Sequence, residues 1–524
     1  MSKYSSEFKL EVVKYYLENN VGYQAAADHF GVAYSPVLRW VRKYKENGYV
    51  GLMKNQRASY SENFKQKRIK NSKMQKIQLK SVYFFIKIAY NIYREVKAML
   101  VEFSVKNFKS FKDKVTFSME AATGTENEEN IISTPNINER ILKSTAIYGA
   151  NASGKTNLMN AFTAAILMIR KSNNRQVGEK LMEMEPFEFD EKTKLEPCEF
   201  EFVFYVKGIK YIYGFIADKE KVYEEYLYQY FTAKPTRIFE RTNVNEYKFL
   251  QADEVKLNTI KTQNIENKLF LATATTWNYD KTKDPYLWFA NNIDTYTGGI
   301  SLNDFAIESY SKDDNEKLKN FTLKLLNEAD IVIKNFSVEM EERDVDSNML
   351  MLFKQLNLST ALTPQKQKDV KIRMTHEITN ENGDKNNYEL NLIYESSGTQ
   401  ILFSFAPILK DVFENGKILV IDEIERSLHP NLVEMIIKFF HNPQINKGNA
   451  QLIFNTHDTN LLSLDIFRRD QIWFAEKDPK KGATDLYPLD DFSVRKNENI
   501  QKGYLNGRYG AIPFVAMGYS LWED

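Results

Sequence analysis

The stretch "STAIYGANASGKTNLMNAF", residues 144–162, limits the folds open to this 524-residue chain more than any other part of it. It reads as an apolar strand, a glycine-rich turn and an apolar helix, which is the order of a phosphate-binding P-loop and predicts an α/β fold. Gly149 and Gly154 allow backbone conformations that a Cβ would block. We therefore expect nucleotide binding by the loop residues Gly149, Ala150, Asn151, Ala152, Ser153, Gly154, Lys155 and Thr156.

A P-loop needs a second, acidic strand, and "GKILVIDEIERSLHP" supplies one. We expect a short buried strand at residues 418–421 that ends at Asp422 and Glu423. Phosphate chemistry assigns Lys155 to the β and γ oxygens, and Thr156 and Asp422 to Mg²⁺. Glu423 follows one residue later and is expected to orient or deprotonate the attacking water. The two motifs together predict a hydrolase that uses ATP and Mg²⁺.

Two further stretches narrow the choice among classes of P-loop protein. "YESSGTQILFSF" places Ser397 and Gly398 at the start of a helix, with Gln400 just inside it. A hydroxyl and free N–H groups at a helix start can bind a γ-phosphate. "QLIFNTHDTNLL" places His457 after another apolar strand, in position to sense that phosphate. A P-loop kinase acting on a small molecule needs neither feature, so both argue against that alternative.

The order of these motifs resembles the ATP-binding-cassette ATPases of the SMC and overcoming-lysogenization-defect type. "NFKSF", "GANASGKTN", "DEIERSLHP" and "YLNGRYGAIPF" make residues 99–524 similar to bacterial AAA-type core-domain ATPases associated with abortive infection and phage defence. The resemblance implies an ABC/SMC-like P-loop fold with Lys155, Glu423 and His457 as catalytic residues. It implies a signature at Ser397, Gly398 and Gln400. Because one γ-phosphate is not readily enclosed by both helix starts of a single chain, we expect a homodimer around ATP. We also expect an effector protein in trans.

The sequence departs from this family pattern in its signature, because "SSGTQ" lacks the Leu and the second Gly of the commonest form. The glutamine of the loop that usually contacts Mg²⁺ is also not assigned, and Gln176 and Gln229 both stay open. In the tail, Gly507 and Gly510 mark turns, whereas Arg508 has no chemical account from the sequence.

More than two hundred residues separate the P-loop from the signature. "CEFEFVFYVKGIKYIYGFIAD" alternates like a hairpin around Gly208, and "NEKLKNFTLKLLNEAD" has a helical pattern. No sustained heptads occur, which argues against long coiled-coil arms. We therefore expect an α+β lobe inserted at about residues 172–390. Ahead of the P-loop, "MLVEFSVKNFKSFKDKVTFSM" predicts two paired strands.

The first 98 residues have a different character, with 19 Lys and Arg against 7 Asp and Glu. Residues 1–54 read as three short helices, the last one with Ser35 as N-cap and Pro36 at its first position. They resemble the N-terminal helix-turn-helix of insertion-sequence transposases. Arg39, Arg42 and Lys43 would face outward toward DNA phosphates and guanine edges. The alternative is a small helical bundle with a solvated basic face.

Residues 55–98 contain no Gly or Pro and show no clean period, so we read them as a basic linker. Codons for Arg94, Glu95 and Val96 can encode a ribosome-binding sequence just before Met99. We therefore hypothesise that a mobile-element fragment became fused ahead of a gene that starts at Met99, and that 55–98 are not natively translated. The alternative is a solvated linker helix.

The chain has one cysteine and no apolar run long enough to cross a bilayer, so we expect a cytoplasmic protein without a disulfide. The leading prediction is an ATP-hydrolysing molecular switch of a phage-defence system. The alternative is a DNA-binding regulator or transposition accessory protein in which residues 1–54 dominate.

Overall fold

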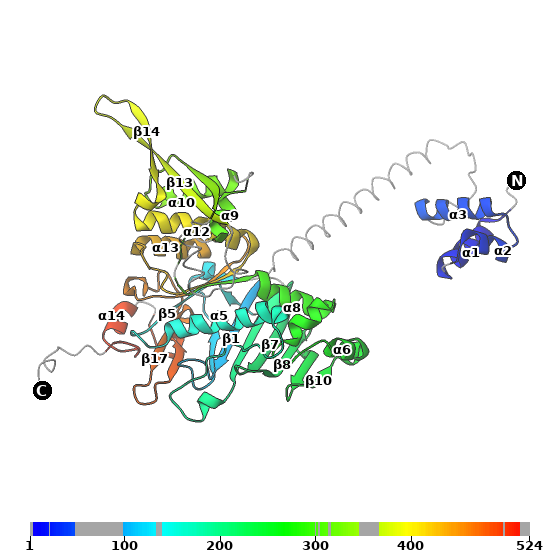
Figure 1. The fold of residues 1–524 in the computed structure, drawn as a ribbon, viewed down its shortest axis with the longest axis horizontal. Coiled ribbons are helices and arrows are strands. Elements are labelled where there is room, and N and C mark those ends of the chain that lie inside the picture. The colour runs from blue at the N-terminus through cyan, green and yellow to red at the C-terminus, as the bar shows by residue number, and fades with distance from the viewer. Residues whose placement is uncertain are drawn as a thin grey trace, which may run out of the picture. The chain divides into compact units, whose positions relative to one another are not determined.

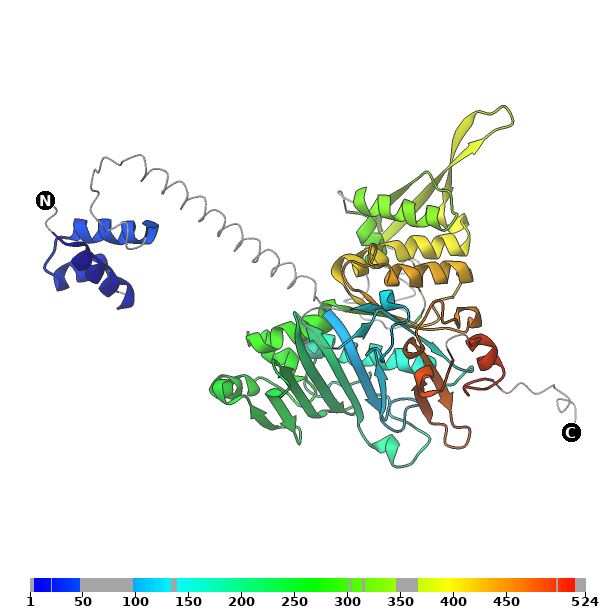
Figure 2. The same ribbon diagram turned by 180° about the vertical axis from the view of Figure 1, so that it is seen from behind.

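Figures 1 and 2 show the computed structural model, which describes residues 4–19, 21–47, 98–132, 139–298, 300–301, 304–312, 316–344, 366–495 and 498–513. The chain divides into two compact units, residues 1–88 and 89–524. The predicted linker, residues 55–98, lies outside the described residues apart from Ala98. Within the described ranges, none of the helices combines the length and the apolar character that crossing a membrane requires.

The N-terminal unit contains the three predicted helices: α1 (Ser6–Glu18), α2 (Tyr23–His29) and α3 (Tyr34–Asn47). Its core is apolar and is formed by Val12, Val13, Ala26, Ala27, Val32, Val37, Trp40 and Val41. The prediction of Ser35 as N-cap is wrong, because α3 already begins at Tyr34. Pro36 therefore lies within the first turn, where its missing N–H leaves no intrahelical bond unmade.

The second unit contains two large sheets. The first has seven antiparallel strands in the order β10-β9-β8-β7-β6-β1-β2. Their bounds are β1 Ala98–Lys106, β2 Val115–Ser118, β6 Cys198–Val206, β7 Ile209–Ala217, β8 Val222–Tyr230, β9 Thr236–Thr242 and β10 Glu246–Phe249. The predicted pairing of β1 with β2 and the hairpin of β6 and β7 around Gly208 are both confirmed.

The second sheet carries the P-loop and has six strands in the order β11-β15-β16-β5-β17-β18. Their bounds are β5 Ser144–Tyr148, β11 Ile293–Tyr296, β15 Ile418–Ile421, β16 Gln451–Asn455, β17 Ile472–Lys477 and β18 Thr484–Pro488. All neighbours are parallel except β17 and β18. Parallel strands end at a common edge, so the chain segments that follow β5, β15 and β16 meet there.

Helices cover both faces of the P-loop sheet (Figure 1). Alternate strand residues divide between two cores: Ile147, Val420 and Ile453 belong to the core of α5 (Lys155–Lys171). Their neighbours Tyr148, Ile421 and Phe454 belong to the core of α12 (Ser397–Asn415) and α13 (Pro430–His441). The P-loop helix and the signature helix therefore lie in different layers.

Residues 172–390, where an inserted α+β lobe is predicted, supply four groups of elements. Strands β6–β10 extend the sheet of β1 and β2, since β6 pairs with β1 along its whole length and so removes an unpaired edge. Strand β11 joins the P-loop sheet beside β15. A third group packs on α12 and comprises α9 (Asp304–Tyr310), α10 (Glu316–Glu328), β12 (Asn335–Asp344), β13 (Lys366–Thr379) and β14 (Lys385–Asn391). Helices α6 (Glu254–Lys261), α7 (Phe270–Thr276) and α8 (Asp280–Asn291) lie on the α5 side.

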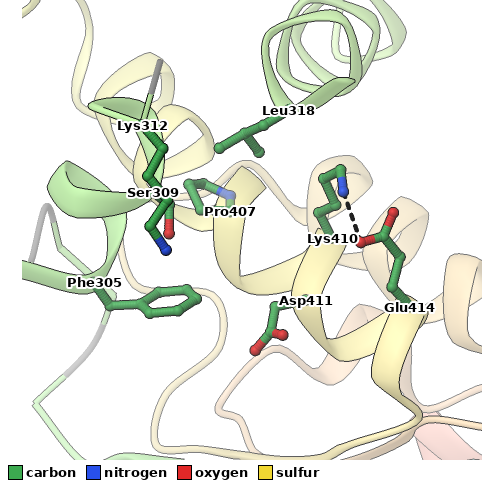
Figure 3. A pocket seen from close by; sticks show the side chains of 8 residues that line it. All are labelled: Phe305, Ser309, Lys312, Leu318, Pro407, Lys410, Asp411 and Glu414. Carbon is green, nitrogen blue, oxygen red and sulfur yellow. Dashed lines mark hydrogen bonds and ion pairs between the residues drawn. The ribbon is translucent and has the colours of Figure 1, made fainter. Parts of the chain in front are cut away.

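A hollow of about 230 Å³ lies between α9, α10 and α12, and Figure 3 shows the side chains that line it. Three of its four charged side chains form ion pairs within the chain, and the fourth is Lys312. Lys410 pairs with Glu414 at 2.6 Å, and Asp411 pairs with Lys417 at 2.6 Å. Because these charges pair with each other, they leave no convergent set to hold a ligand, and the nucleotide motifs remain the stronger candidates.

Candidate nucleotide site

The P-loop connects the end of β5 to the start of α5 through backbone that favours glycine. Gly149 has φ +157° and Gly154 has φ +111°. A Cβ at Gly149 would meet the Ala475 carbonyl oxygen and the Ser153 hydroxyl, and one at Gly154 would meet the Thr484 side chain. The loop therefore depends on both glycines, as its sequence predicted.

Lys155 is buried at the base of this loop, with 5% of its surface exposed. Its Nζ donates to the carbonyl oxygens of Gly149 (2.8 Å) and Ala150 (3.0 Å). Burial lowers the pKa of Lys155 to about 8, and the carboxylates of Glu425, Asp422 and Glu423 oppose that shift. An ammonium held by two neutral carbonyls can exchange them for phosphate oxygens, which are stronger acceptors.

Two observations indicate that the loop fits a nucleotide with Mg²⁺. The Ser153 hydroxyl oxygen is buried and finds no hydrogen-bond partner among the described residues. The Thr156 hydroxyl is hydrogen-bonded to the Asp422 carboxylate, so the two predicted metal ligands are in contact. Burial raises the pKa of Asp422, against hydrogen bonds from Asn455 and Thr156. A hydroxyl and a carboxylate are hard oxygen ligands of the kind Mg²⁺ prefers.

Asn455, the last residue of β16, holds the acidic pair in place. Its Nδ2 donates to Asp422 Oδ1 at 2.5 Å, and its Oδ1 accepts the backbone N–H of Glu423 at 2.6 Å. Glu423 itself has φ +52°, a left-handed conformation that this hydrogen bond helps to maintain. Asn455 was not among the predicted site residues. The available signal was a polar residue at the end of a buried strand, two positions before His457.

His457 lies beside Glu423, with 3.9 Å between His457 Nε2 and Glu423 Oε1. Its backbone N–H donates to Glu425 Oε1 at 2.6 Å. The second carboxylate oxygen of Glu425 is buried and has no hydrogen-bond partner in the described part of the chain. Glu425 therefore connects the segment after β15 to the segment after β16. It was not among the predicted site residues, and the signal that could have found it is its place as the third acid of "DEIE".

The signature lies at the start of α12. Ser396 is the N-cap, and its hydroxyl accepts the Thr399 N–H at 3.1 Å. Ser397 is exposed and Gly398 is half-buried. Gln400 Nε2 donates to the Glu395 carbonyl at 2.9 Å and the Ile393 carbonyl at 3.3 Å, so its amide turns back toward the preceding residues. Across the described residues, no hydrogen bond joins the signature to the P-loop of its own chain.

Neither candidate for the metal-contacting glutamine bonds to Thr156 or Asp422 within the described ranges. Gln176 Nε2 donates to the Asn174 carbonyl at 3.4 Å, in the loop after α5. Gln229 is buried within β8 of the other sheet. The assignment of this glutamine stays open.

The tail motif "YLNGRYGAIPF" is held by contacts of Arg508 and Tyr509. Arg508 forms an ion pair with Glu498, and the Tyr509 hydroxyl donates to the same carboxylate at 2.8 Å. The Tyr487 hydroxyl of β18 donates to the Tyr509 carbonyl at 2.9 Å. Gly507 and Gly510 have φ values of +75° and +68°, as turns require. The motif therefore fastens the segment after α14 (Ile500–Leu505) to the edge of the P-loop sheet.

In the N-terminal unit, the predicted DNA-contacting side chains lie on one helix. Arg39, Arg42 and Lys43 are exposed on α3, whereas Val37 and Val41 of the same helix are buried. A basic face opposite a buried face is the arrangement that a groove-binding helix needs.

Comparison with known families matches two parts of the chain. Residues 144–463 match the AAA_21 family, whose description names an AAA domain, the AbiEii toxin and a type IV TA system. Residues 8–59 match a helix-turn-helix domain family.

Curated relatives match a short part of the chain. It is 44% identical over 54 residues to the 20.7 kDa protein of insertion element IS1223 from Lactobacillus johnsonii, covering 10% of this chain and 30% of that protein. It is 43% identical over 53 residues to the 21.4 kDa protein of insertion element IS1296 from Mycoplasma mycoides subsp. mycoides SC, covering 10% and 29%. The chain thus spans less than a third of the length of these relatives.

Among solved structures, the SMC head domain from Thermotoga maritima aligns with 74% of this chain and 98% of its own length, at 14% identity and a TM-score of 0.33. An Smc head domain derived from Pyrococcus furiosus, with an extended coiled coil and bound to the C-terminal domain of ScpA, aligns with 75% and 96%, at 12% identity and a TM-score of 0.32.

Proposed function

Because the chain belongs to the AAA_21 family of AAA-domain ATPases, we propose that it is an ATP-driven molecular switch. It binds ATP with Mg²⁺, closes as a homodimer around two nucleotides, hydrolyses ATP, and so controls an effector protein in trans. The observation that supports this most is the meeting of four motif residues at one end of the P-loop sheet: Thr156 bonded to Asp422, and Glu423 beside His457.

Each residue then has a role that follows from its contacts. The loop N–H groups and Lys155 hold the β- and γ-phosphates. Thr156 and Asp422 would hold Mg²⁺, which when bound neutralises phosphate charge. Glu423, fixed through its backbone N–H by Asn455, orients the attacking water and accepts its proton. His457 lies beside Glu423 and would donate to a γ-phosphate oxygen.

The two layers of the unit support closure as a dimer. The start of α5 would face the phosphates of its own chain, while α12 packs in the opposite core and leaves Ser397 at its start exposed. One γ-phosphate is enclosed by both helix starts when a second chain supplies the signature. Twofold symmetry then gives two equivalent sites.

ATP turnover by the purified full chain tests this proposal. Lys155→Ala should lose nucleotide binding, since the loop then lacks its only charge on the phosphates. Glu423→Gln should bind ATP and dimerise but hydrolyse it at least about a hundredfold more slowly. Lys171→Ala, at the exposed end of α5, is a matched control and should keep wild-type turnover. Wild-type turnover in Glu423→Gln would rule out the assigned water chemistry.

The family description, with its AbiEii toxin and type IV TA system, supports a role in bacterial phage defence inside the cytoplasm. Cells carrying the gene should resist a phage that plates on cells carrying Lys155→Ala. Equal plating on both strains, across a panel of phages that challenge the native host, would remove the defence role and leave the ATPase unaffected.

A second candidate is a DNA-binding regulator or transposition accessory protein. The helix-turn-helix match at residues 8–59 and the insertion-element relatives support it. Binding should require Arg39, Arg42 and Lys43 and weaken steeply with salt, because these cations displace counterions from DNA. Equal DNA affinity after removal of residues 1–54 would exclude it.

A further inference from the structure

The turn that leads into the signature helix displays two large apolar side chains to solvent. It comprises Asn391 to Ser396 and includes a single turn of 3-10 helix, Leu392–Tyr394. Leu392 is buried, but Ile393 is 67% exposed and Tyr394 is 72% exposed. Scattered apolar residues on a surface are ordinary. Two adjacent ones, three or four residues before Ser397, form a small apolar patch beside a proposed ligand-binding group.

This turn is held rigidly from three sides. Asn391 Oδ1 accepts the Ile393 N–H at 3.1 Å, which closes the turn locally. The Glu395 carboxylate meets His376 of β13 at 2.7 Å. The Gln400 amide donates to the carbonyls of Ile393 and Glu395, which ties the turn to α12. A patch fixed in this way loses little conformational entropy when something docks on it.

We propose that Ile393 and Tyr394 form an apolar anchor that docks on a second copy of this chain when ATP closes the dimer. The inference rests on the proposed function, because it assumes that Ser397 reaches the nucleotide of the other chain. Three residues of chain span at most about 11 Å, so Tyr394 lies close enough to Ser397 to share an interface with it. Tyrosine with an adjacent aliphatic side chain is a common centre of protein interfaces.

The anchor also accounts for Gln400 in "SSGTQ". Its amide donates both its hydrogens to carbonyls of the anchor turn and so faces backward, away from the exposed helix start. Gln400 thereby positions the anchor relative to Ser397. The contact surface and the phosphate-binding group move together as one rigid piece with α12.

The test uses the full chain carrying Glu423→Gln, which is expected to accumulate as an ATP-bound dimer. Tyr394→Ser or Ile393→Ser is added, and the dimer dissociation constant is measured by sedimentation equilibrium with saturating ATP and Mg²⁺. Each anchor side chain occurs twice in a symmetric dimer, so each substitution should raise that constant about a hundredfold. The affinity of the monomer for ATP should stay unchanged.

Matched controls come from exposed apolar residues at the other sheet. Phe231 is 66% exposed after β8, and Val255 is 85% exposed on α6. Phe231→Ser and Val255→Ser in the same background should leave the dimer constant unchanged. All four positions are exposed, so the variants should share one melting temperature, which circular dichroism checks.

The outcomes separate the anchor from the function on which it rests. If Glu423→Gln stays monomeric with ATP while the anchor is intact, the proposed dimer itself fails. If it dimerises and both anchor variants dimerise equally well, the anchor is wrong and the switch stands. A benzoylphenylalanine crosslinker placed at 394 should give an adduct of twice the chain mass only with ATP. A lack of that adduct, while the dimer forms, overturns the choice of a second copy as occupant and leaves an effector protein as the next partner to test.

Discussion

The P-loop and the start of the signature helix lie in one unit, yet their polar groups find partners in different ways. At the P-loop, Lys155 bonds to its own loop and Thr156 bonds to Asp422. At the signature, Ser397 is exposed, and the Gln400 amide is bonded to the turn behind it. The P-loop groups are therefore organised by contacts within this chain, whereas Ser397 at the start of the signature helix is left exposed.

The largest expected effect comes from mutating the P-loop in one chain and the signature in another, and then mixing the two chains. Lys155→Ala and Ser397→Arg should each abolish ATP turnover, the first through lost binding and the second through blocked closure. An equimolar mixture should recover about a quarter of wild-type turnover, because half of the dimers are mixed and each has one intact composite site. If mixed dimers form and the mixture stays inactive, the sites work only as a pair; if turnover per chain persists at protein concentrations too low for any dimer, the shared site is wrong.

A smaller effect is expected at Glu425, which joins the acidic strand end to His457. Glu425→Ala removes the acceptor of the His457 N–H and should lower kcat by about tenfold to a hundredfold with little change in KM. Glu425→Gln keeps an acceptor oxygen in the same place and should stay within about threefold of wild type. Steady-state kinetics on both variants measures this difference. Equal losses of kcat in the two variants would show that the charge of Glu425, rather than its hydrogen bond to His457, supports turnover.

The two layers also meet at His441, the last residue of α13, whose Nε2 lies 2.7 Å from the hydroxyl of Ser144 at the start of β5. Burial lowers the pKa of His441 from 6.5 to about 3, with Lys143 and Lys438 adding to the shift. Between pH 3 and pH 6.5, His441 is protonated in the unfolded chain and neutral in the folded chain. His441 therefore costs no stability above pH 6.5, and stability falls as pH drops from there toward 3.

The free energy of unfolding should fall by about 1.4 kcal/mol for each pH unit below 6.5, or by about 2 kcal/mol between pH 7 and pH 5. Urea unfolding of the wild type and of His441→Gln measures it, since glutamine keeps a polar group near Ser144 and cannot titrate in this range. An identical pH dependence in both proteins would assign the loss to other groups.

The smallest effect is expected from the N-terminal unit. Residues 99–524 alone should hydrolyse ATP within about twofold of the full chain, because the motif residues and both cores of the ATPase belong to the second unit. Parallel turnover measurements on the two proteins, with and without DNA, check this. A strong loss in the shorter protein would make residues 1–98 part of the ATPase.

A related prediction concerns which chain the native cell makes. The codons before Met99 can encode a ribosome-binding site, so most of the product should start at Met99. Intact-mass measurement on protein expressed from its own upstream DNA gives the answer. Chains that begin mainly at Met1 would contradict the fusion hypothesis.

The sequence predicted those parts of the site that local order determines. A glycine-rich loop between strand and helix, an acidic strand end and a strand-end histidine are contiguous patterns, and the structure has each as expected. Asn455 and Glu425 were not predicted, because their contacts arise only when strands β15 and β16 lie side by side. Thirty-three residues separate Asp422 from Asn455, and no periodicity reports that pairing.

The same limit applies to the elements of residues 172–390. The alternation in "CEFEFVFYV" correctly predicts a strand, but its partner β1 lies about a hundred residues earlier in the chain. A four-residue strand such as β11 carries even less signal, although it completes one edge of the P-loop sheet. Local patterns predict elements, whereas membership of a sheet depends on pairings that only the folded chain reveals.

Strands β12, β13 and β14 form a three-stranded sheet that packs on α12 and would amplify a movement of this helix. Phe336 and Met374 of this sheet share a core with Phe403 of α12, so the sheet and the helix turn together. Strand β13 begins at Lys366, eight residues before Met374, which at about 3.3 Å per residue gives an arm of about 26 Å. A rotation of α12 by about 10° would therefore move the far end of that arm by about 5 Å, enough to convert a small adjustment at a phosphate into a displacement that another protein can sense.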